Sequence, residues 1–225
     1  MKISTGKTKE QLVDDKKYLS IVSHYEACLE KHGDCHLGVD WPKKEDVDTR
    51  CKVMLELIQR RGPAKASLLD FGCGTSYLFE YILENRIEGI KYTGLDLSPK
   101  FVELSRRKFP MNAYYCLDIL DDDVQLPSYD YIVMNGVFTE KRRLSFEEML
   151  LYFKRVLIRL FPKANIGIAF NVMSKHVDWE REELFHLAFD TLASFLSSQI
   201  TRDFVFRNDY GLYEYTTYLY KPSGT

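Results

Sequence analysis

The sequence lacks long apolar segments, an excess of charge and paired cysteine motifs. No window approaches the roughly 18 apolar residues of a membrane span, and residues 1–20 have no apolar core typical of a signal peptide. The 31 basic and 33 acidic residues give a formal net charge of -2, which predicts no general affinity for nucleic acids or anionic membranes. The five cysteines form no C-x-x-C pair, which favours reduced thiols and a cytoplasmic location.

The composition favours one packed domain. Hydrophobic residues make up 45% of the 225 residues and aromatic residues 14%, enough for a core. Helical patterns cover 9–31, 44–61, 75–86, 99–109, 145–161 and 182–199, and strand patterns cover 66–74, 90–98, 112–120, 129–138, 165–173, 202–209 and 212–221. Alternating strands and helices predict an α/β fold with a mostly parallel sheet, helices on both faces and a C-terminal antiparallel hairpin. We expect the two helices within residues 1–63 to form a lid or appendage on a domain of residues 64–225. The oligomeric state is left open.

A glycine turn joins the first predicted strand to the next helix. The segment LLDFGCG, residues 68–74, places Gly72 and Gly74 where the main chain can approach a ligand closely. In open α/β sheets such ligands bind at the carboxyl ends of the strands. A dinucleotide fingerprint would need a third glycine at position 77, where Tyr77 stands, so an oxidoreductase is disfavoured. The pattern D-x-G-x-G, which begins at Asp70, instead favours S-adenosylmethionine.

Acidic residues also end the second and third predicted strands. Asp96 follows the strand of residues 90–98, where a carboxylate can accept both hydroxyls of a ribose. Asp118 follows the third strand, where an adenine amino group would lie. Asp96 alone could be a helix cap, and Asp118 alone could be a loop acid beside residues 121–123. Three acids at three successive strand ends, the first beside paired glycines, indicate a nucleoside cofactor.

Residues 66–221 resemble the class I S-adenosylmethionine-dependent methyltransferases. The resemblance implies a Rossmann-like seven-stranded sheet, S-adenosylmethionine as cofactor and S-adenosylhomocysteine as product. It places Asp70, Gly72 and Gly74 at the methionine portion, Asp96 at the ribose, and Asp118 with Ile119 at the adenine. Further cofactor-binding residues are expected at Cys73, Leu97, Asn135, Gly136 and Trp41. Ser76 departs from the third glycine that many members carry. The segments HGDCHLGVDWP and MNGVFTEK also resemble a bacterial subgroup associated with carbohydrate and surface-polysaccharide pathways.

The acceptor is expected above the fourth and fifth strands. Asn135 is followed by Gly-Val-Phe, unlike the N/D-P-P-Y/F motif of methyltransferases acting on amino groups of nucleobases or glutamine, and no acidic cluster stands there to bind magnesium. We therefore predict chemistry without a metal, with Asn135, His36 and His176 as candidate catalytic residues. His176 has a side chain suited to a general base near neutrality, although it could be a surface histidine. Four cations, Lys141, Arg142, Arg143 and Lys175, suggest an anionic acceptor or, alternatively, a solvated charge run.

The segment KHGDCHLGVDWP, residues 31–42, lies between the two N-terminal helices. Its His32, Cys35 and His36 are too few and too crowded for a zinc site. We interpret the segment as an active-site lid, in which Trp41 supplies a stacking face and His36 a polar tip. A structural connector between helices is the alternative.

Two functions of different classes remain. The leading hypothesis is an enzyme that methylates an oxygen or nitrogen of a small molecule bearing a phosphate, carboxylate or sugar. The alternative is a regulatory or scaffold module that binds S-adenosylmethionine without transferase activity. An open acceptor pocket would favour the enzyme.

Overall fold

The computed structural model describes residues 16–61 and 63–222. Its strands are β1 (Ala66–Phe71), β2 (Ile90–Asp96), β3 (Ala113–Cys116), β4 (Tyr129–Phe138), β5 (Ala164–Ser174), β6 (His186–Leu187), β7 (Phe204–Arg207) and β8 (Glu214–Tyr220). Its helices are α2 (Leu19–His32), η1 (His36–Val39), α3 (Lys44–Arg61), α4 (Tyr77–Glu84), α5 (Pro99–Lys108), α6 (Phe146–Leu160), η2 (Phe161–Lys163) and α7 (Phe189–Gln199). Among these helices, none combines the length and apolar character that crossing a bilayer requires.

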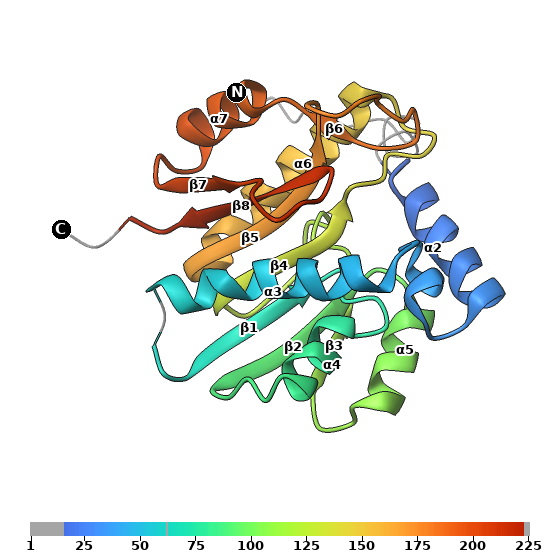
Figure 1. Ribbon diagram of the computed structural model, residues 1–225. Coiled ribbons are helices and arrows are strands. Elements are labelled where there is room, and N and C mark those ends of the chain that lie inside the picture. Colours follow the sequence, from blue (N-terminus) through green and yellow to red (C-terminus); the bar gives the residue numbers. More distant parts are fainter. Residues whose placement is uncertain (1–15, 62, 223–225) are drawn as a thin grey trace, which may run out of the picture.

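The strands form one twisted sheet in the order β3-β2-β1-β4-β5-β8-β7 (Figure 1). Strands β1 to β5 run parallel, β8 is antiparallel to β5, and β7 is antiparallel to β8. This arrangement confirms the predicted Rossmann-like fold and its C-terminal hairpin. The chain order reverses between β1 and β4, so the carboxyl ends of these neighbouring strands open the crevice in which such folds bind ligands.

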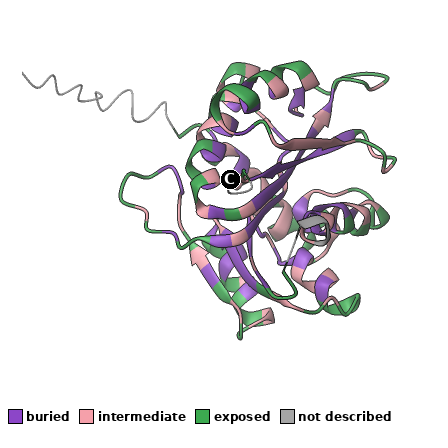
Figure 2. Ribbon diagram, turned by 90° about the vertical axis from the view of Figure 1, so that its left-hand side faces the viewer, coloured by how far each residue is buried: buried purple, intermediate pink, exposed green. Residues whose placement is uncertain are grey.

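Helices cover both faces of the sheet, and each face has its own hydrophobic core. One core packs α6 and α7 on the sheet through Phe153, Leu157 and Leu196, all fully buried. The other packs α3 and α4 through residues such as Met54 and Leu78. Figure 2 shows the buried strands between helices whose outer surfaces are exposed. The helix α6 begins with the predicted capping box of Ser145, whose hydroxyl accepts from the Glu148 N–H.

Two elements differ from the sequence prediction. Residues 182–188 are not helical: β6 pairs parallel to β5, and α7 begins only at Phe189. Tertiary partners stabilise the extended backbone there, because the Phe185 N–H donates to the Thr139 carbonyl and His186 Nδ1 hydrogen-bonds the Ser174 carbonyl. The hairpin loop between β7 and β8 is also longer than the predicted two-residue turn. The first part of the helix predicted for 9–31 lies outside the described residues.

The two N-terminal helices have different positions. The helix α2 lies at the carboxyl-end edge of the sheet beside α5, where Ser98 Oγ donates to Glu26 and Lys100 Nζ lies 3.1 Å from Glu26 (Figure 1). The helix α3 instead packs on the sheet, with Cys51 and Leu57 fully buried. Of the two helices expected to form a lid or appendage, α3 therefore contributes its apolar face to the core, and a lid role for α2 stays a prediction.

Candidate active site

The glycine turn after β1 is fixed to the end of β2. The N–H groups of Gly72 and Cys73 both donate to the Leu95 carbonyl, at 2.7 and 3.0 Å. Gly72 has a φ of 74°, and a Cβ there would lie 2.5 Å from Val137 Cγ2. Glycine is therefore required at this position both by the backbone angle and by the space available. Asp96 Oδ2 accepts from the Gly74 N–H at 2.9 Å, so the turn and this carboxylate form one unit.

Two carboxylates lie beside this turn: Asp70, which is buried, and Asp96, which is half-buried. Burial raises the pKa of Asp70 to about 7, although the Tyr92 hydroxyl donates to its Oδ2 at 2.7 Å. Burial also raises the pKa of Asp96 to about 6, and hydrogen bonds from the backbone of Ser98 and Gly74 oppose that rise. Carboxylates removed from water in this way are stabilised by a cationic ligand. The site therefore favours a bound molecule that carries positive charge.

A pocket of about 120 Å³ opens above the turn. Seven aromatic side chains line it: Tyr18, Tyr25, Trp41, Phe71, Tyr77, Phe101 and Tyr152. Thr75 and Asn135 also line it, and both Thr75 Oγ1 and Asn135 Oδ1 are buried without a hydrogen-bond partner. Buried polar atoms of this kind are normally satisfied, which indicates a ligand that bonds to them. Aromatic faces, carboxylates and free polar atoms together fit a sulfonium ion joined to a ribose and an aromatic base.

Most of the predicted cofactor residues lie around this pocket. Those that line it are Asp70, Gly72, Cys73, Gly74, Asp96, Leu97, Asn135, Gly136 and Trp41. Asp118 and Ile119 do not. Ile119 is buried in the core, and Asp118 Oδ2 accepts from the hydroxyl of Tyr18, at 2.5 Å. Asp118 therefore reaches the pocket through Tyr18, and its adenine contact stays a prediction.

The segment of residues 31–42 contributes two side chains to the pocket wall. It contains the short helix η1, after which Asp40 adopts a left-handed φ of 56°. Val39 and Trp41 line the pocket, and a Cβ on Gly136 would lie 3.1 Å from the Trp41 ring. His36 lines neither pocket described here. Its Nδ1 hydrogen-bonds the Trp41 carbonyl at 2.7 Å, so His36 orients the loop that carries Trp41.

A second and larger pocket, of about 590 Å³, adjoins the first at Trp41. Segments that follow β4 and β5 line it together with α3 and the loop before β8. Its charged residues are Asp40, Asp46, Glu140, Asp178 and Glu214 with Lys43, Arg50, Arg142 and Arg181. The five acids and four bases nearly balance, so this pocket is polar without strong net charge. Of the residues singled out from the sequence, Arg142, Trp41 and Trp179, which was expected near the mouth of the acceptor pocket, line this pocket. Most of the others follow no motif.

Glu140 and Arg142 form the charged centre of the larger pocket. Glu140 is only 9% exposed, and burial raises its pKa to about 7 while Arg142 opposes that rise. Arg142 Nη2 donates to Asp40 Oδ2 at 2.8 Å. Both residues of this pair have left-handed backbone, with φ of 51° at Arg142 and 56° at Asp40. Such conformations cost about 1–3 kcal/mol each and cluster at functional sites.

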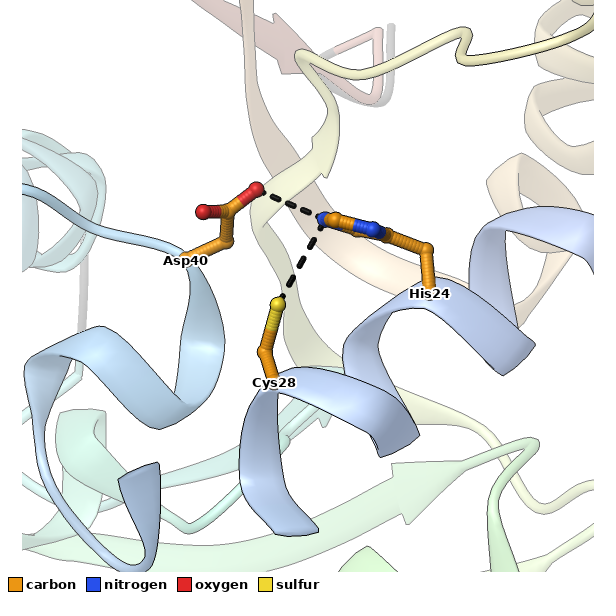
Figure 3. Close-up of side chains that lie close together, drawn as sticks. All are labelled: His24, Cys28 and Asp40. Carbon is orange, nitrogen blue, oxygen red and sulfur yellow. Dashed lines mark hydrogen bonds and ion pairs between the residues drawn. The ribbon is translucent and has the colours of Figure 1, made fainter. Parts of the chain in front are cut away.

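A cluster of potential metal ligands consists of the imidazole of His24, the thiol of Cys28 and the carboxylate of Asp40. These ligand atoms lie within 4.8 Å of one another (Figure 3). His24 and Cys28 come from α2, and Asp40 follows η1. The Arg142 guanidinium contacts both His24 and Asp40. Burial and this neighbouring positive charge lower the pKa of His24. A metal cation would have to displace the guanidinium, so the cluster serves to hold Arg142.

The other predicted candidates lie apart from both pockets. The exposed ring of His176 stacks on Phe189, with ring centroids 5.5 Å apart. Lys175 lies 3.5 Å from Glu180 as an ion pair. Lys141 and Arg143 line neither pocket, so of the four predicted cations only Arg142 does.

Comparisons with known proteins agree with this geometry. The family model described as "Methyltransferase domain" matches residues 69–157. A candidate methyltransferase of Mycobacterium tuberculosis, Rv1506c, is 27% identical over 70% of this chain and 94% of its own length. The malonyl-[acyl-carrier protein] O-methyltransferase of Acetivibrio thermocellus is 29% identical over 38% of this chain and 30% of its own length.

Solved structures share the fold at low sequence identity. The 1,6-didemethyltoxoflavin-N1-methyltransferase of Burkholderia thailandensis, solved with bound 1,6-didemethyltoxoflavin and S-adenosylhomocysteine, has a TM-score of 0.63 at 16% identity. The match covers 93% of this chain and 91% of that one. Magnesium protoporphyrin IX methyltransferase of Synechocystis PCC 6803, solved with S-adenosylmethionine, has a TM-score of 0.58 at 14% identity and covers 97% and 99%.

Fold, glycine turn and methyltransferase domain define the class of this protein. It is an S-adenosylmethionine-dependent methyltransferase. The residues of the larger pocket bear on which acceptor it methylates.

Proposed function

We propose that this protein transfers the methyl group of S-adenosylmethionine to a hydroxyl or amino group of a small molecule held in the larger pocket. The observation that carries this proposal is the junction at Trp41 of a cofactor-type pocket and a polar pocket. Magnesium protoporphyrin IX methyltransferase and 1,6-didemethyltoxoflavin-N1-methyltransferase, which share the fold, support a small-molecule acceptor.

The residues of the smaller pocket bind and orient. Asp96 would accept the ribose hydroxyls, because its two oxygens keep lone pairs beside their backbone bonds. Asn135 and Thr75 would bond the methionine portion through their unpartnered oxygens. The bound cofactor supplies an electrophilic methyl group on a cationic sulfur. The protein then contributes mainly alignment of the acceptor and exclusion of water.

The charges in the larger pocket support a hydroxyl-rich acceptor, such as a sugar-linked metabolite, over a simple anion. Arg50 Nε donates to Glu214 at 2.8 Å, and Arg142 donates to Asp40, so both guanidinium groups already have a carboxylate partner. Trp179 and Tyr213, which are 74% and 66% exposed, offer aromatic faces to the C–H side of a sugar ring. These features agree with the resemblance to carbohydrate-pathway enzymes. We also propose a cytoplasmic location for the enzyme.

Calorimetry with S-adenosylhomocysteine and label transfer from methyl-labelled S-adenosylmethionine test the proposal. The acceptor panel contains monosaccharides, nucleotide sugars and hydroxy acids. We expect micromolar cofactor binding and label transfer to a sugar-bearing compound. Binding without transfer to the panel or to a bacterial metabolite extract would favour the scaffold module, and absence of binding would refute the proposal. Asp178→Asn, at an exposed acid of the larger pocket, serves as a variant control that should keep cofactor affinity.

A further inference from the structure

The place where the two pockets meet limits which side chains can reach a reacting acceptor. Trp41 lines both pockets and lies against Gly136 near the end of β4. From that end the chain continues directly into the wall of the larger pocket. The Thr139 hydroxyl donates to the Gly136 carbonyl at 2.9 Å, which fixes the turn that leads to Glu140.

Glu140 has a carboxylate oxygen available for a ligand. Its Oε2 is buried without a hydrogen-bond partner. Arg142 Nε lies 3.2 Å away but is also unpartnered, so the two form an ion pair without a hydrogen bond. A buried carboxylate oxygen without a donor is costly. A hydroxyl group of an acceptor in the pocket would satisfy it.

The other carboxylates and histidines of the larger pocket are less suited to take a proton. Glu214 accepts from Asn171 at one oxygen and from Arg50 at the other. His186 uses both ring nitrogens, one toward the Ser174 carbonyl and one toward the Arg181 N–H. Asp40 is held by Arg142 and His24. Asp178 is exposed to solvent and Asp46 is partly exposed.

We infer that Glu140 is the general base of the methyl transfer proposed above, and that the acceptor group is a hydroxyl. This inference rests on the proposed function. The Glu140 carboxylate takes the hydroxyl proton while the oxygen forms its bond to the methyl carbon, and the electron pair of the breaking carbon–sulfur bond stays on sulfur. The products are a methyl ether, S-adenosylhomocysteine and protonated Glu140, so atoms and charge balance.

The surroundings of Glu140 adjust its proton affinity to this task. Arg142 and Arg181 favour the charged form, whereas burial, Asp40 and Glu183 favour the neutral form. Burial is the largest of these effects and raises the pKa of Glu140 to about 7. A general base with a pKa near the working pH combines sufficient ionised form with a strong affinity for the proton.

The test has one arm that needs no acceptor. The protein is labelled with ¹³C-glutamate, and its side-chain carboxyl resonances are recorded by NMR. The resonance that is missing from the spectrum of Glu140→Gln is assigned to Glu140. Its chemical shift is followed from pH 4 to pH 9, with and without S-adenosylhomocysteine. We expect a midpoint near 7 in the free protein, and a midpoint below 5 would overturn the inference.

The second arm measures turnover with the methylated member of the acceptor panel. Glu140→Gln should lower kcat by roughly 10²–10⁴-fold, and the rise of kcat/KM with pH up to about 7 should disappear. Glu140→Asp should restore part of the rate. A variant that unfolds at lower temperature but keeps kcat and the pH profile would make Glu140 a structural partner of Arg142 and overturn the inference. Unchanged S-adenosylhomocysteine affinity in Glu140→Gln separates this failure from failure of the proposed function. Glu103→Gln, at an exposed acid of α5 that lines neither pocket, is the matched control and should keep both kcat and cofactor affinity.

Discussion

The two pockets that meet at Trp41 are built in different ways. The smaller one consists largely of backbone turns and aromatic faces, with Asp70 and Asp96 beside the glycines. The larger one consists of charged side chains from distant segments, arranged as pairs such as Arg50 with Glu214. A pocket formed by backbone tolerates little change and suits a constant ligand. A pocket formed by paired side chains can be altered residue by residue, which suits a ligand that differs between relatives.

Substitutions at two glycines test most directly whether the smaller pocket is the more rigid one. Gly72 in the smaller pocket and Gly211 in the larger one both have positive φ, 74° and 77°. A Cβ on Gly72 would overlap Val137, whereas a Cβ on Gly211 would meet nothing within 4 Å. Gly72→Ala should therefore lower the free energy of unfolding by roughly 2–5 kcal/mol, from backbone strain plus overlap, and Gly211→Ala by about 1 kcal/mol from strain alone. Urea titrations of both variants measure the difference, and equal losses would show that the smaller pocket is not the more rigid one.

In the larger pocket, Glu140 should make the stability of the protein depend on pH. Burial raises its folded-state pKa from 4.5 to about 7. A carboxyl with a raised pKa contributes stability that is complete below pH 4.5 and is lost as the pH rises through 7. Between pH 5 and 8, wild-type protein should lose up to about 3 kcal/mol relative to Glu140→Gln.

Thermal and urea unfolding of both proteins across this range provide the measurement. Asp70 and Asp96, whose pKa values burial also raises, are present in both proteins, so they cancel in the difference. Parallel stability curves for the two proteins would mean that Glu140 titrates at its ordinary pKa.

Asp96 should have its largest effect on cofactor affinity. Asp96→Ala removes the carboxylate that accepts from the Gly74 and Ser98 N–H groups and that faces the pocket. We expect binding of S-adenosylhomocysteine to weaken by roughly 1.5–3 kcal/mol, the range for a hydrogen bond to a charged group. Calorimetry on Asp96→Ala, Asp96→Asn and Asp178→Asn provides the comparison. Unchanged affinity in the first variant would remove Asp96 from the cofactor site.

The segment of residues 31–42 should report on both pockets. Trp41 lines both pockets and is one of only two tryptophans. In Trp179→Phe, all tryptophan fluorescence therefore comes from Trp41. S-adenosylhomocysteine should change that emission. His36→Ala should lower turnover a few-fold, because its hydrogen bond to the Trp41 carbonyl orients the loop, while cofactor affinity stays within a few-fold. Loss of thermal stability alone, with normal turnover, would reduce the segment to a connector.

Chelation should have the smallest effect of all. Arg142 contacts His24 and Asp40, so its positive charge opposes a metal ion in the cluster with Cys28. We expect turnover to be unchanged in EDTA. Activity lost in EDTA and restored by Zn²⁺ or Mg²⁺ would instead show that the cluster binds a metal.

Local patterns in the sequence predict most of the elements and most of the cofactor pocket. Buried strands alternate with amphipathic helices, and the capping box at Ser145 marks the start of α6. Asp70, Gly72 and Gly74 are close in sequence, and Asp96 ends the next strand, so neighbouring parallel strands bring them together. The helix predicted from residue 182 fails because β6 hydrogen-bonds to partners more than ten residues away, which a local pattern does not contain.

The class of sheet, the glycine turn and the acids at the strand ends could be predicted from the sequence, because they depend on backbone geometry and on residues near one another in the chain. The larger pocket, in contrast, depends on how distant segments pack together. The tertiary structure brings Arg50, Glu140, Arg142 and Glu214 together from α3, the end of β4 and the start of β8. It also placed His176 outside both pockets and gave Glu140 its raised pKa. Burial and charge pairing are properties of the packed chain, so no spacing between residues along the sequence encodes them.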